Sequence, residues 1–229
     1  MTLLLSKPNI KVGKNVRGFS IPADVTCPGA TELCRQHCYA KHRRFANNIV
    51  SSANEKRLSR AESREFAREM IETINRLRRR SLVRIHVSGD FYSAAYVRKW
   101  IAIIKACPET RFWAYTRSWR LPRLRKALRE LAELPNMSLW WSTDRETHRE
   151  SGRPPRWKNV RVAWMLVPED CDRVPAYVDL VFRVMRDTRQ TTVAGKPVCP
   201  AENGINQHHE VTCTQCGICY KEPICLQQS

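Results

Sequence analysis

The sequence contains no long apolar run. Its first apolar stretch, Leu3 to Leu5, is too short for a signal peptide, and no stretch of about 18 apolar residues could cross a membrane. We therefore expect a cytoplasmic protein without a membrane span. In a reducing cytoplasm ten cysteines do not indicate a disulfide scaffold, and clustered thiols there usually bind metal.

Acidic residues are scarce relative to basic ones. The chain has 22 Asp and Glu against 40 Lys and Arg, mostly arginine, which gives a formal net charge of +18. The planar fork of arginine matches phosphate, so we expect a nucleic acid, DNA or RNA, as partner. A basic surface that only keeps the protein soluble is the alternative.

The sequence also lacks a helix-turn-helix or other sequence-reading module, so contact would be with backbone or single strands. Four arginines at three- and four-residue spacing predict one basic face on a long helix that begins at Ser52 or Ser59 and ends near Arg80. These arginines are Arg57, Arg60, Arg64 and Arg68. Four tryptophans could stack bases if they were exposed, although burial is the commoner state. They are Trp113, Trp119, Trp140 and Trp141.

No dinucleotide glycine fingerprint is present, although predicted strands and helices alternate along the chain. This alternation indicates a parallel sheet, and we expect an α/β fold: an incomplete (β/α) barrel of five to six units, with a weak last helical unit. The predicted strands are 16–21, 83–87, 111–116, 137–142, 160–167 and 178–184. The partial barrel spans residues 1–194, and a small cysteine-rich lobe that folds around metal spans residues 195–229.

The sharpest motif is a group of four cysteines near the end of the chain, which we expect to bind metal. Cys213, Cys216 and Cys219 are each separated by two residues, with Cys199-Pro200 upstream, the arrangement that ferredoxins use for a [4Fe-4S] cluster. Cys225 could replace Cys199 as the fourth ligand. A zinc site that includes His208 or His209 is the alternative.

A second group holds three cysteines and has no obvious fourth ligand. Cys27, Cys34 and Cys38 follow the first predicted strand, with a turn at Pro28-Gly29. Three thiolates on a four-iron cluster leave one iron open for a substrate. Zinc completed by His37 or His42 is the alternative.

The three-cysteine loop after a first strand resembles the radical S-adenosylmethionine (SAM) superfamily. That resemblance implies that SAM binds the open iron as cosubstrate and that Ser88, Gly89 and Asp90 contact its methionine end. It also implies ribose contacts from Ser142, Thr143 and Asp144. The spacing Cys-x6-Cys-x3-Cys departs from the usual Cys-x3-Cys-x2-Cys, which bears directly on whether SAM is cleaved.

A closer resemblance covers nearly the whole chain. The strings FSIPADVTCPGATELCRQHCYA, HVSGDFYSAAYVRKW and FWAYTRSW, with the final cysteine-rich run, are similar to an uncharacterised phage and plasmid family named after a phage gene product. This resemblance implies a phage or plasmid origin in a bacterial host and carries little functional information.

Polar residues at the carboxyl ends of predicted strands form the candidate catalytic set, because (β/α) barrels place their sites at that edge. We expect Asp90, Arg117 and Asp144 to act there, with Tyr115 and Arg145 nearby. The sequence thus favours an iron–sulfur enzyme of radical-SAM type. A non-catalytic metal-stabilised nucleic-acid-binding protein is the second hypothesis, and a metal-dependent nuclease using Asp90, Asp144 and His86 is the third.

Overall fold

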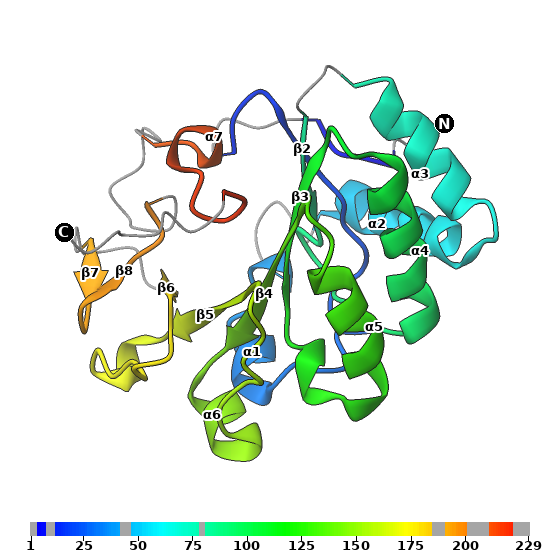
Figure 1. Cartoon of the computed structure of the whole chain (residues 1–229). Helices are drawn as coiled ribbons and strands as arrows, with labels where there is room; N and C mark the ends of the chain where they lie inside the picture. Colours follow the sequence, from blue (N-terminus) through cyan, green and yellow to red (C-terminus); the bar gives the residue numbers. More distant parts are fainter. Residues whose placement is uncertain are drawn as a thin grey trace.

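A computed structural model describes residues 4–7, 12–41, 47–77, 81–184, 191–200 and 211–221. Six strands form one sheet in which every neighbouring pair is parallel and the order follows the sequence. The strands are β1 (Val16–Gly18), β2 (Leu82–Ile85), β3 (Arg111–Thr116), β4 (Met137–Thr143), β5 (Val160–Leu166) and β6 (Leu180–Arg183). The sheet curves into a half-barrel (Figure 1), which confirms the predicted partial (β/α) barrel.

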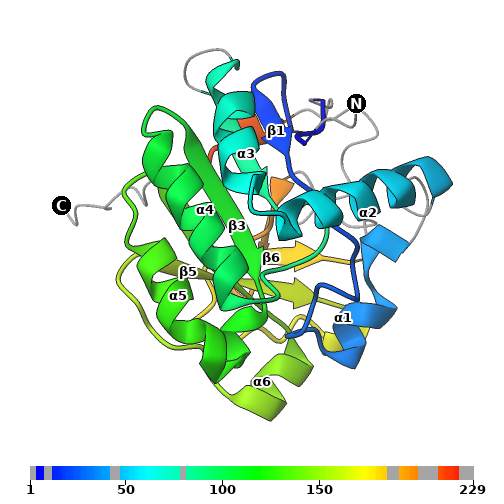
Figure 2. The same cartoon turned by 90° about the vertical axis from the view of Figure 1, so that its right-hand side faces the viewer.

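Helices connect the strands. They are α1 (Glu32–Gln36), α2 (Asn48–Glu62), α3 (Phe66–Asn75), α4 (Ala94–Ala106), α5 (Pro122–Ala132) and α6 (Arg145–Ser151). Of these, α3, α4 and α5 cover the outer, convex face of the sheet (Figure 2). Short 3-10 turns are η1 (Tyr39–Lys41), η3 (Ser118–Arg120) and η4 (Pro168–Asp170). Because only η4 lies between β5 and β6 in the described chain, the predicted weakness of the last helical unit is confirmed. Within the described residues, no helix has the length and apolarity needed to cross a membrane.

Alternation along the strands divides the side chains between two faces. In β3, Phe112 and Ala114 belong to the large outer core beneath the helices, whereas Trp113 and Tyr115 belong to clusters on the inner, concave face. The outer core includes Trp100 of α4, which has no exposed surface. The inner face is therefore also lined by large side chains and needs its own cover.

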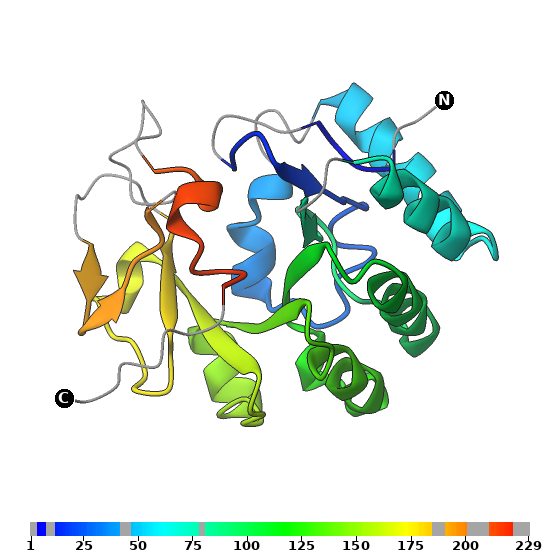
Figure 3. The same ribbon diagram turned by 45° about the horizontal axis from the view of Figure 1, so that its top comes forward.

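The C-terminal segment 211–221 supplies this cover. Its short helix α7 (Cys213–Cys216) lies inside the curve of the sheet, opposite the outer helices (Figure 3). Tyr220 packs against Trp113, with ring centroids 5.4 Å apart, and Trp140 Nε1 donates a 2.9 Å hydrogen bond to the carbonyl of Cys219. A small hairpin, β7 (Thr192–Val193) and β8 (Lys196–Pro197), precedes this segment beside β6.

The prediction of one long helix ending near Arg80 is wrong. The chain forms α2 and α3 instead, with Ser63 in an extended conformation between them, and α2 begins after Asn47 rather than at Ser52 or Ser59. Residues 78–80 lie outside the described part of the chain.

A lysine from another helix accounts for the break. Lys99 Nζ on α4 donates to the carbonyls of Ala61, Glu62 and Ser63 at 2.7, 3.0 and 2.9 Å. These are carbonyls at the end of α2, so the ammonium takes the place of the next helical turn.

Candidate functional site

The loop that carries Cys27 lies at the carboxyl edge of the half-barrel. The amide of Cys27 donates to the carbonyl of Asp24, and the carbonyl of Cys27 accepts from the amide of Ala30, both at 3.1 Å. The Asp24 carboxylate binds Arg35 Nε at 3.1 Å and Lys41 Nζ at 2.6 Å, which ties the start of the loop to its end. Both ion pairs are partly exposed, so they guide the loop more than they stabilise the fold.

Helix α1 presents Cys34 toward the same edge. Thr31 caps this helix, because its hydroxyl accepts a 3.1 Å hydrogen bond from the Cys34 amide. The amide of Leu33 donates to Glu146 Oε2 on α6 at 2.8 Å. A five-residue helix has little stability of its own, so these contacts hold it in place.

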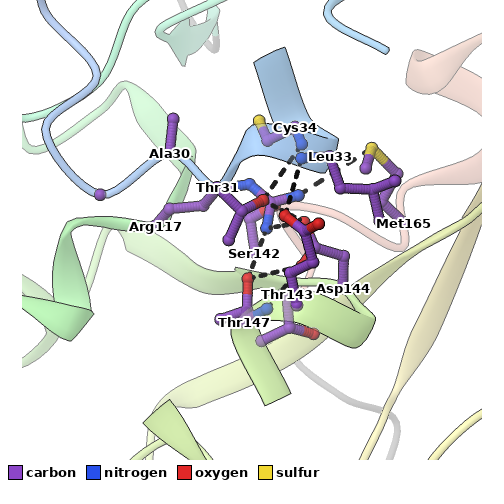
Figure 4. A network of polar contacts seen from close by, with 12 residues as sticks. Ala30, Thr31, Leu33, Cys34, Arg117, Ser142, Thr143, Asp144, Thr147 and Met165 are labelled. Carbon is purple, nitrogen blue, oxygen red and sulfur yellow. Dashed lines mark hydrogen bonds and ion pairs between the residues drawn. The ribbon is translucent and has the colours of Figure 1, made fainter. Parts of the chain in front are cut away.

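A buried ion pair lies beneath α1. Arg117 Nη1 is 2.6 Å from Asp144 Oδ2, with side-chain exposures of 7% and 0%. Thr31 Oγ1 donates to the same carboxylate at 2.9 Å, and Thr147 donates to it through its amide and hydroxyl at 2.7 and 2.8 Å. Figure 4 shows Thr31, Arg117, Asp144 and Thr147 pointing toward one another.

This network uses all four acceptor positions of the Asp144 carboxylate. Burial raises the pKa of Asp144, but the charge of Arg117 and the bonds from Thr147 outweigh burial and hold the pKa below its usual value. Asp144 is therefore ionised, caps α6 and anchors the cap of α1. Its contacts position the loop that holds Cys34.

Asp90 joins this network from the end of β2. Its carboxylate accepts from the amide of Phe91 at 2.6 Å and from the amide of Arg117 at 2.9 Å. Burial raises the pKa of Asp90 to about 6, although these amides and Thr116 oppose the rise. Asp90, Arg117 and Asp144 thus come from three different strand ends and meet beside Cys34, as the barrel topology predicts.

Ser88 and Gly89 connect β2 to the cysteine loop. The Ser88 hydroxyl donates to the carbonyl of Ile21 at 2.9 Å. Gly89 has a φ of +84°, and a Cβ there would lie 2.4 Å from Ile21 Cγ1 and 2.7 Å from Thr26 Oγ1. Glycine is therefore required here by its backbone angle and by close contact with the segment that leads to Cys27.

The predicted ribose contacts lie at the end of β4. Thr143 donates to the carbonyl of Ala163 at 2.9 Å, and the carbonyl of Ser142 accepts from Trp119 Nε1 at 3.1 Å. Cosubstrate binding by these residues stays a prediction.

The three thiols of the first group lie close enough to interact electrostatically. Burial raises the pKa of Cys27 to about 12, and Asp90, Cys34 and Cys38 add to the rise. Burial also raises the pKa of Cys34, against the charge of Arg117. The raised pKa values favour the protonated thiols of Cys27 and Cys34, and a bound metal is what would make them thiolates.

No disulfide links any of the nine cysteines that the structure describes. Among the described residues no three His, Cys, Asp or Glu side chains converge closely enough to hold a single metal ion. His37 ends α1 as its C-terminal cap. The alternative ligands His42, His208, His209 and Cys225 lie outside the described residues.

The second cysteine group lies within the half-barrel. Thr212 caps α7, which carries Cys213 and Cys216 one turn apart, and Cys219 follows in a turn. The hydroxyl of Tyr115 on β3 donates to Cys219 Sγ at 2.8 Å. Burial raises the pKa of Tyr115 well above its usual value, so its hydroxyl keeps the proton that it donates.

Cys199 belongs to the same inner cluster as Cys219, which includes Trp140, Leu180 and Phe182. Its amide donates to the carbonyl of Val181 on β6 at 2.8 Å. The structure therefore places Cys199, more than ten residues upstream of the other three, in the same cluster as Cys219.

The prediction that one helix carries the four arginines is wrong, whereas their contact with nucleic acid stays a prediction. Arg57 and Arg60 lie on α2, Arg64 lies in the connection, and Arg68 lies on α3. Arg60 pairs with Glu69, and Arg68 pairs with Glu65 and Glu72. Arg57 Nη1 donates to Asn54. The break at Ser63 divides the stripe, and carboxylates offset two of its charges.

The four tryptophans do not offer stacking surfaces, since each is at most 1% exposed. Trp113 and Trp140 lie on the inner face, and Trp119 and Trp141 belong to the outer core. All four are therefore buried, which is the commoner state of tryptophan.

Sequence reasoning missed Thr31, Arg84, Glu146 and Thr147. Threonine is a preferred residue at helix N-caps, and this preference could have identified Thr31. Strand alternation could have placed Arg84 on the inner face with Tyr115. The contact of Glu146 with α1 joins segments 113 residues apart, and no local pattern encodes it.

Comparison with known proteins identifies relatives over most of the chain. The family described as Gene product 88 matches residues 3–222. The Gene 88 protein of Mycobacterium phage L5 is 31% identical over 226 residues, which is 92% of this chain and 85% of the relative. The Gene 88 protein of Mycobacterium phage D29 is 29% identical with the same coverage. No solved structure matches the chain. The chain therefore belongs to the Gene product 88 family.

Proposed function

We propose that this protein is an iron–sulfur enzyme of radical-SAM type, with a reactive [4Fe-4S] centre at the edge of the half-barrel and an auxiliary [4Fe-4S] centre inside it. The first centre is held by Cys27, Cys34 and Cys38. The second is held by Cys199, Cys213, Cys216 and Cys219. SAM is the proposed cosubstrate, and the net charge of +18 favours a substrate that is nucleic acid or associated with it.

The observation that carries this proposal is the anchoring of the three-cysteine loop on Asp90, Arg117 and Asp144. These residues come from three consecutive strand ends, the place where barrel enzymes assemble their sites. Hydrogen bonds from Thr31 and to Glu146 fix α1 on this base. Such a buried supporting network holds ligands in one geometry, as a reactive metal centre requires.

The residues around the loop have distinct roles in this proposal. When bound, the cluster would supply one electron and an open iron for the methionine end of SAM. Arg117 interacts electrostatically with the Cys34 thiol and so offsets negative charge at the centre. Ser88 and Gly89 contact the segment that leads to Cys27, and together with Asp90 they would orient the cosubstrate. The inner cover formed by residues 211–221 would keep water from the reacting atoms.

Metal analysis after anaerobic purification tests the proposal. Two cubane clusters predict about eight irons and eight sulfides per chain. Replacing Cys27, Cys34 and Cys38 together with serine should leave about four irons and abolish any change of the EPR spectrum on addition of SAM. As a matched control, serine at Cys107 and Cys171, which lie outside both groups, should preserve the iron content and the SAM response.

Two results would contradict the proposal. Stoichiometric zinc, with no spectroscopic response to SAM in anaerobic protein, would mean that both cysteine groups are structural. A full iron complement that ignores SAM would refute the SAM-dependent role while leaving the clusters in place.

The second candidate function is a non-catalytic, metal-stabilised nucleic-acid-binding protein. The outer surface of α5 favours it, because four basic side chains are exposed there: Arg123, Arg125, Lys126 and Arg129. Replacing Arg123 and Lys126 with glutamate should weaken binding to single-stranded nucleic acid and lower its salt dependence, with SAM binding unaffected. Unchanged binding would show that α5 is not the contact surface.

A further inference from the structure

Arg84 is a basic residue placed where barrel interiors are usually apolar. It lies in the middle of β2, between Val83 and Ile85, whose side chains join the outer core. Strand alternation therefore directs Arg84 to the inner face. Its Nε atom is shielded from solvent and has no hydrogen-bond partner within the described part of the chain.

The neighbours of Arg84 are phenols and thiols. Its Nη2 donates to Tyr39 Oη at 3.4 Å, and its guanidinium lies 5.8 Å from the centre of the Tyr115 ring. Burial lowers the pKa of Arg84, but Tyr39, Tyr115, Cys213 and Cys219 together outweigh burial and raise it. The groups that raise it are two phenols and two thiols of the C-terminal group. Of these, the thiols are the groups that a bound metal converts to anions.

Two more groups on the inner face point to the same segment. Tyr115 donates to Cys219 Sγ at 2.8 Å from the neighbouring strand β3. Arg161 on β5 stacks on Trp140 at 4.0 Å, donates to the carbonyl of Lys221 at 3.2 Å and interacts electrostatically with Cys219. Cationic and donor groups from three strands thus surround the cysteine segment.

We propose that Arg84 is a positioning residue that supplies the counter-charge of the C-terminal metal–thiolate centre, with Tyr115 as hydrogen-bond donor to its Cys219 ligand. A metal held by four thiolates carries net negative charge whether it is zinc or a [4Fe-4S] cluster. Inside the half-barrel that charge is costly unless a cation lies beside it. Arginine suits this place because it is always charged and weakly hydrated.

This inference rests on the proposed function only in requiring metal at the second centre. A bound metal holds its cysteine ligands as thiolates, which places anionic partners beside the buried charge of Arg84. Metal binding therefore supplies a counter-charge to a cation that the fold has already buried. Loading of the centre and insertion of segment 211–221 into the half-barrel should occur together.

Variants of Arg84 test the role of its charge. The background is the full chain with Cys27, Cys34 and Cys38 replaced by serine, so that only the C-terminal centre holds metal. Arg84→Met keeps much of the length and removes the charge, and Arg84→Lys keeps the charge. Arg98→Met, at an exposed position on α4, is the matched control. Release of the bound metal to a chelator is followed over time in each protein.

We expect Arg84→Met to release metal at least about tenfold faster than the background protein, because a buried charge pair has lost one member. Arg84→Lys and Arg98→Met should stay within about threefold of the background. If the bound metal is an iron–sulfur cluster, Arg84→Met should also change its oxidised-to-reduced ratio at a given potential by about tenfold, a shift of about 59 mV toward more negative values.

Equal release from Arg84→Met and Arg84→Lys would overturn the proposal, since it would show that shape and not charge matters. Release from Arg84→Met at the background rate would also overturn it. If Arg84→Met does not fold, Tyr115→Phe takes its place, because this change removes only the donor to Cys219. Faster release from Tyr115→Phe is expected, and an unchanged rate would refute the inner-face environment that we assign.

The outcome separates this inference from the proposed function. Zinc at both centres of the unmodified protein would refute the radical-SAM assignment and leave the comparison of Arg84 variants valid. Absence of any metal at the C-terminal centre would refute the role of Arg84, while the response of the first centre to SAM would still test the enzyme.

Discussion

Replacing Asp144 with asparagine tests whether the buried ion pair holds the cysteine loop. Asparagine keeps the shape and the helix-capping oxygen, so α6 retains its cap. The charge of Arg117 then lies buried at 7% exposure without its carboxylate. Breaking a buried pair typically costs about 3 to 5 kcal/mol, and the retained cap places this variant near 3 kcal/mol.

The expected effect is large enough for thermal unfolding followed by circular dichroism. For a chain of this size about 1 kcal/mol shifts Tm by 2 to 4 °C, so Asp144→Asn should lower Tm by about 6 to 12 °C. The double variant Arg117→Met, Asp144→Asn should be more stable than the sum of the single changes predicts, by about 1 to 3 kcal/mol. The exposed pair Arg129 and Glu133 provides the control, and Glu133→Gln should cost less than about 1 kcal/mol.

The pH dependence of this stabilisation has a definite sign. The pKa of Asp144 in the folded protein lies below its ordinary value of 3.8. The contribution is therefore complete above about pH 4 and is lost as the pH falls through the lowered pKa. An Asp144→Asn shift no larger than that of Glu133→Gln at pH 7 would refute the stabilising role of the buried pair.

Three further predictions concern the framework around the site. Gly89→Ala should destabilise the protein by about 2 to 4 kcal/mol in urea unfolding, because its φ is +84° and the new Cβ would meet Ile21 at 2.4 Å; a loss below about 1 kcal/mol would show that the loop adapts. Burial lowers the pKa of His86 to about 3, so stability should fall by up to about 1.4 kcal/mol per pH unit as the pH drops from about 6.5 toward 3, and His86→Gln should remove that slope. Lys99→Met should cost about 1 to 2 kcal/mol in Tm measurements by uncapping α2, whereas the exposed Lys105→Met should change little.

Local patterns predicted the sheet well and the helix boundaries less well. The strand Arg111–Thr116 has the bounds that its sequence indicates, because β-branched and aromatic residues are followed there by turn-forming ones. The helix before β2 was predicted as one element from its capping boxes and apolar stripe. Lys99 ends it early, and this lysine is more than 35 residues away in the sequence. A contact of that range leaves no signal in a local window.

The sequence predicts which residues gather at the candidate site, but not which contacts they make with one another. Barrel topology correctly brought Asp90, Arg117 and Asp144 to one edge, since parallel strands end together. What the sequence could not show is that these side chains bind one another and α1. The hydroxyl of Thr31 makes this link, because it accepts from the Cys34 amide and donates to the Asp144 carboxylate. Whether the same residues also contact a cosubstrate stays a prediction.

The open side of the half-barrel suggests a structural role for the C-terminal cysteines, separate from any chemistry. A parallel sheet is stable when both of its faces are covered, and a closed barrel does this by filling its own interior. Six strands cannot close, so the inner face with Trp113 and Trp140 needs another cover. Segment 211–221 has only one helical turn, α7, and cannot be stable by itself. Metal bound by its cysteines would supply the missing stability. The cover over the inner face would then depend on the metal at the C-terminal centre.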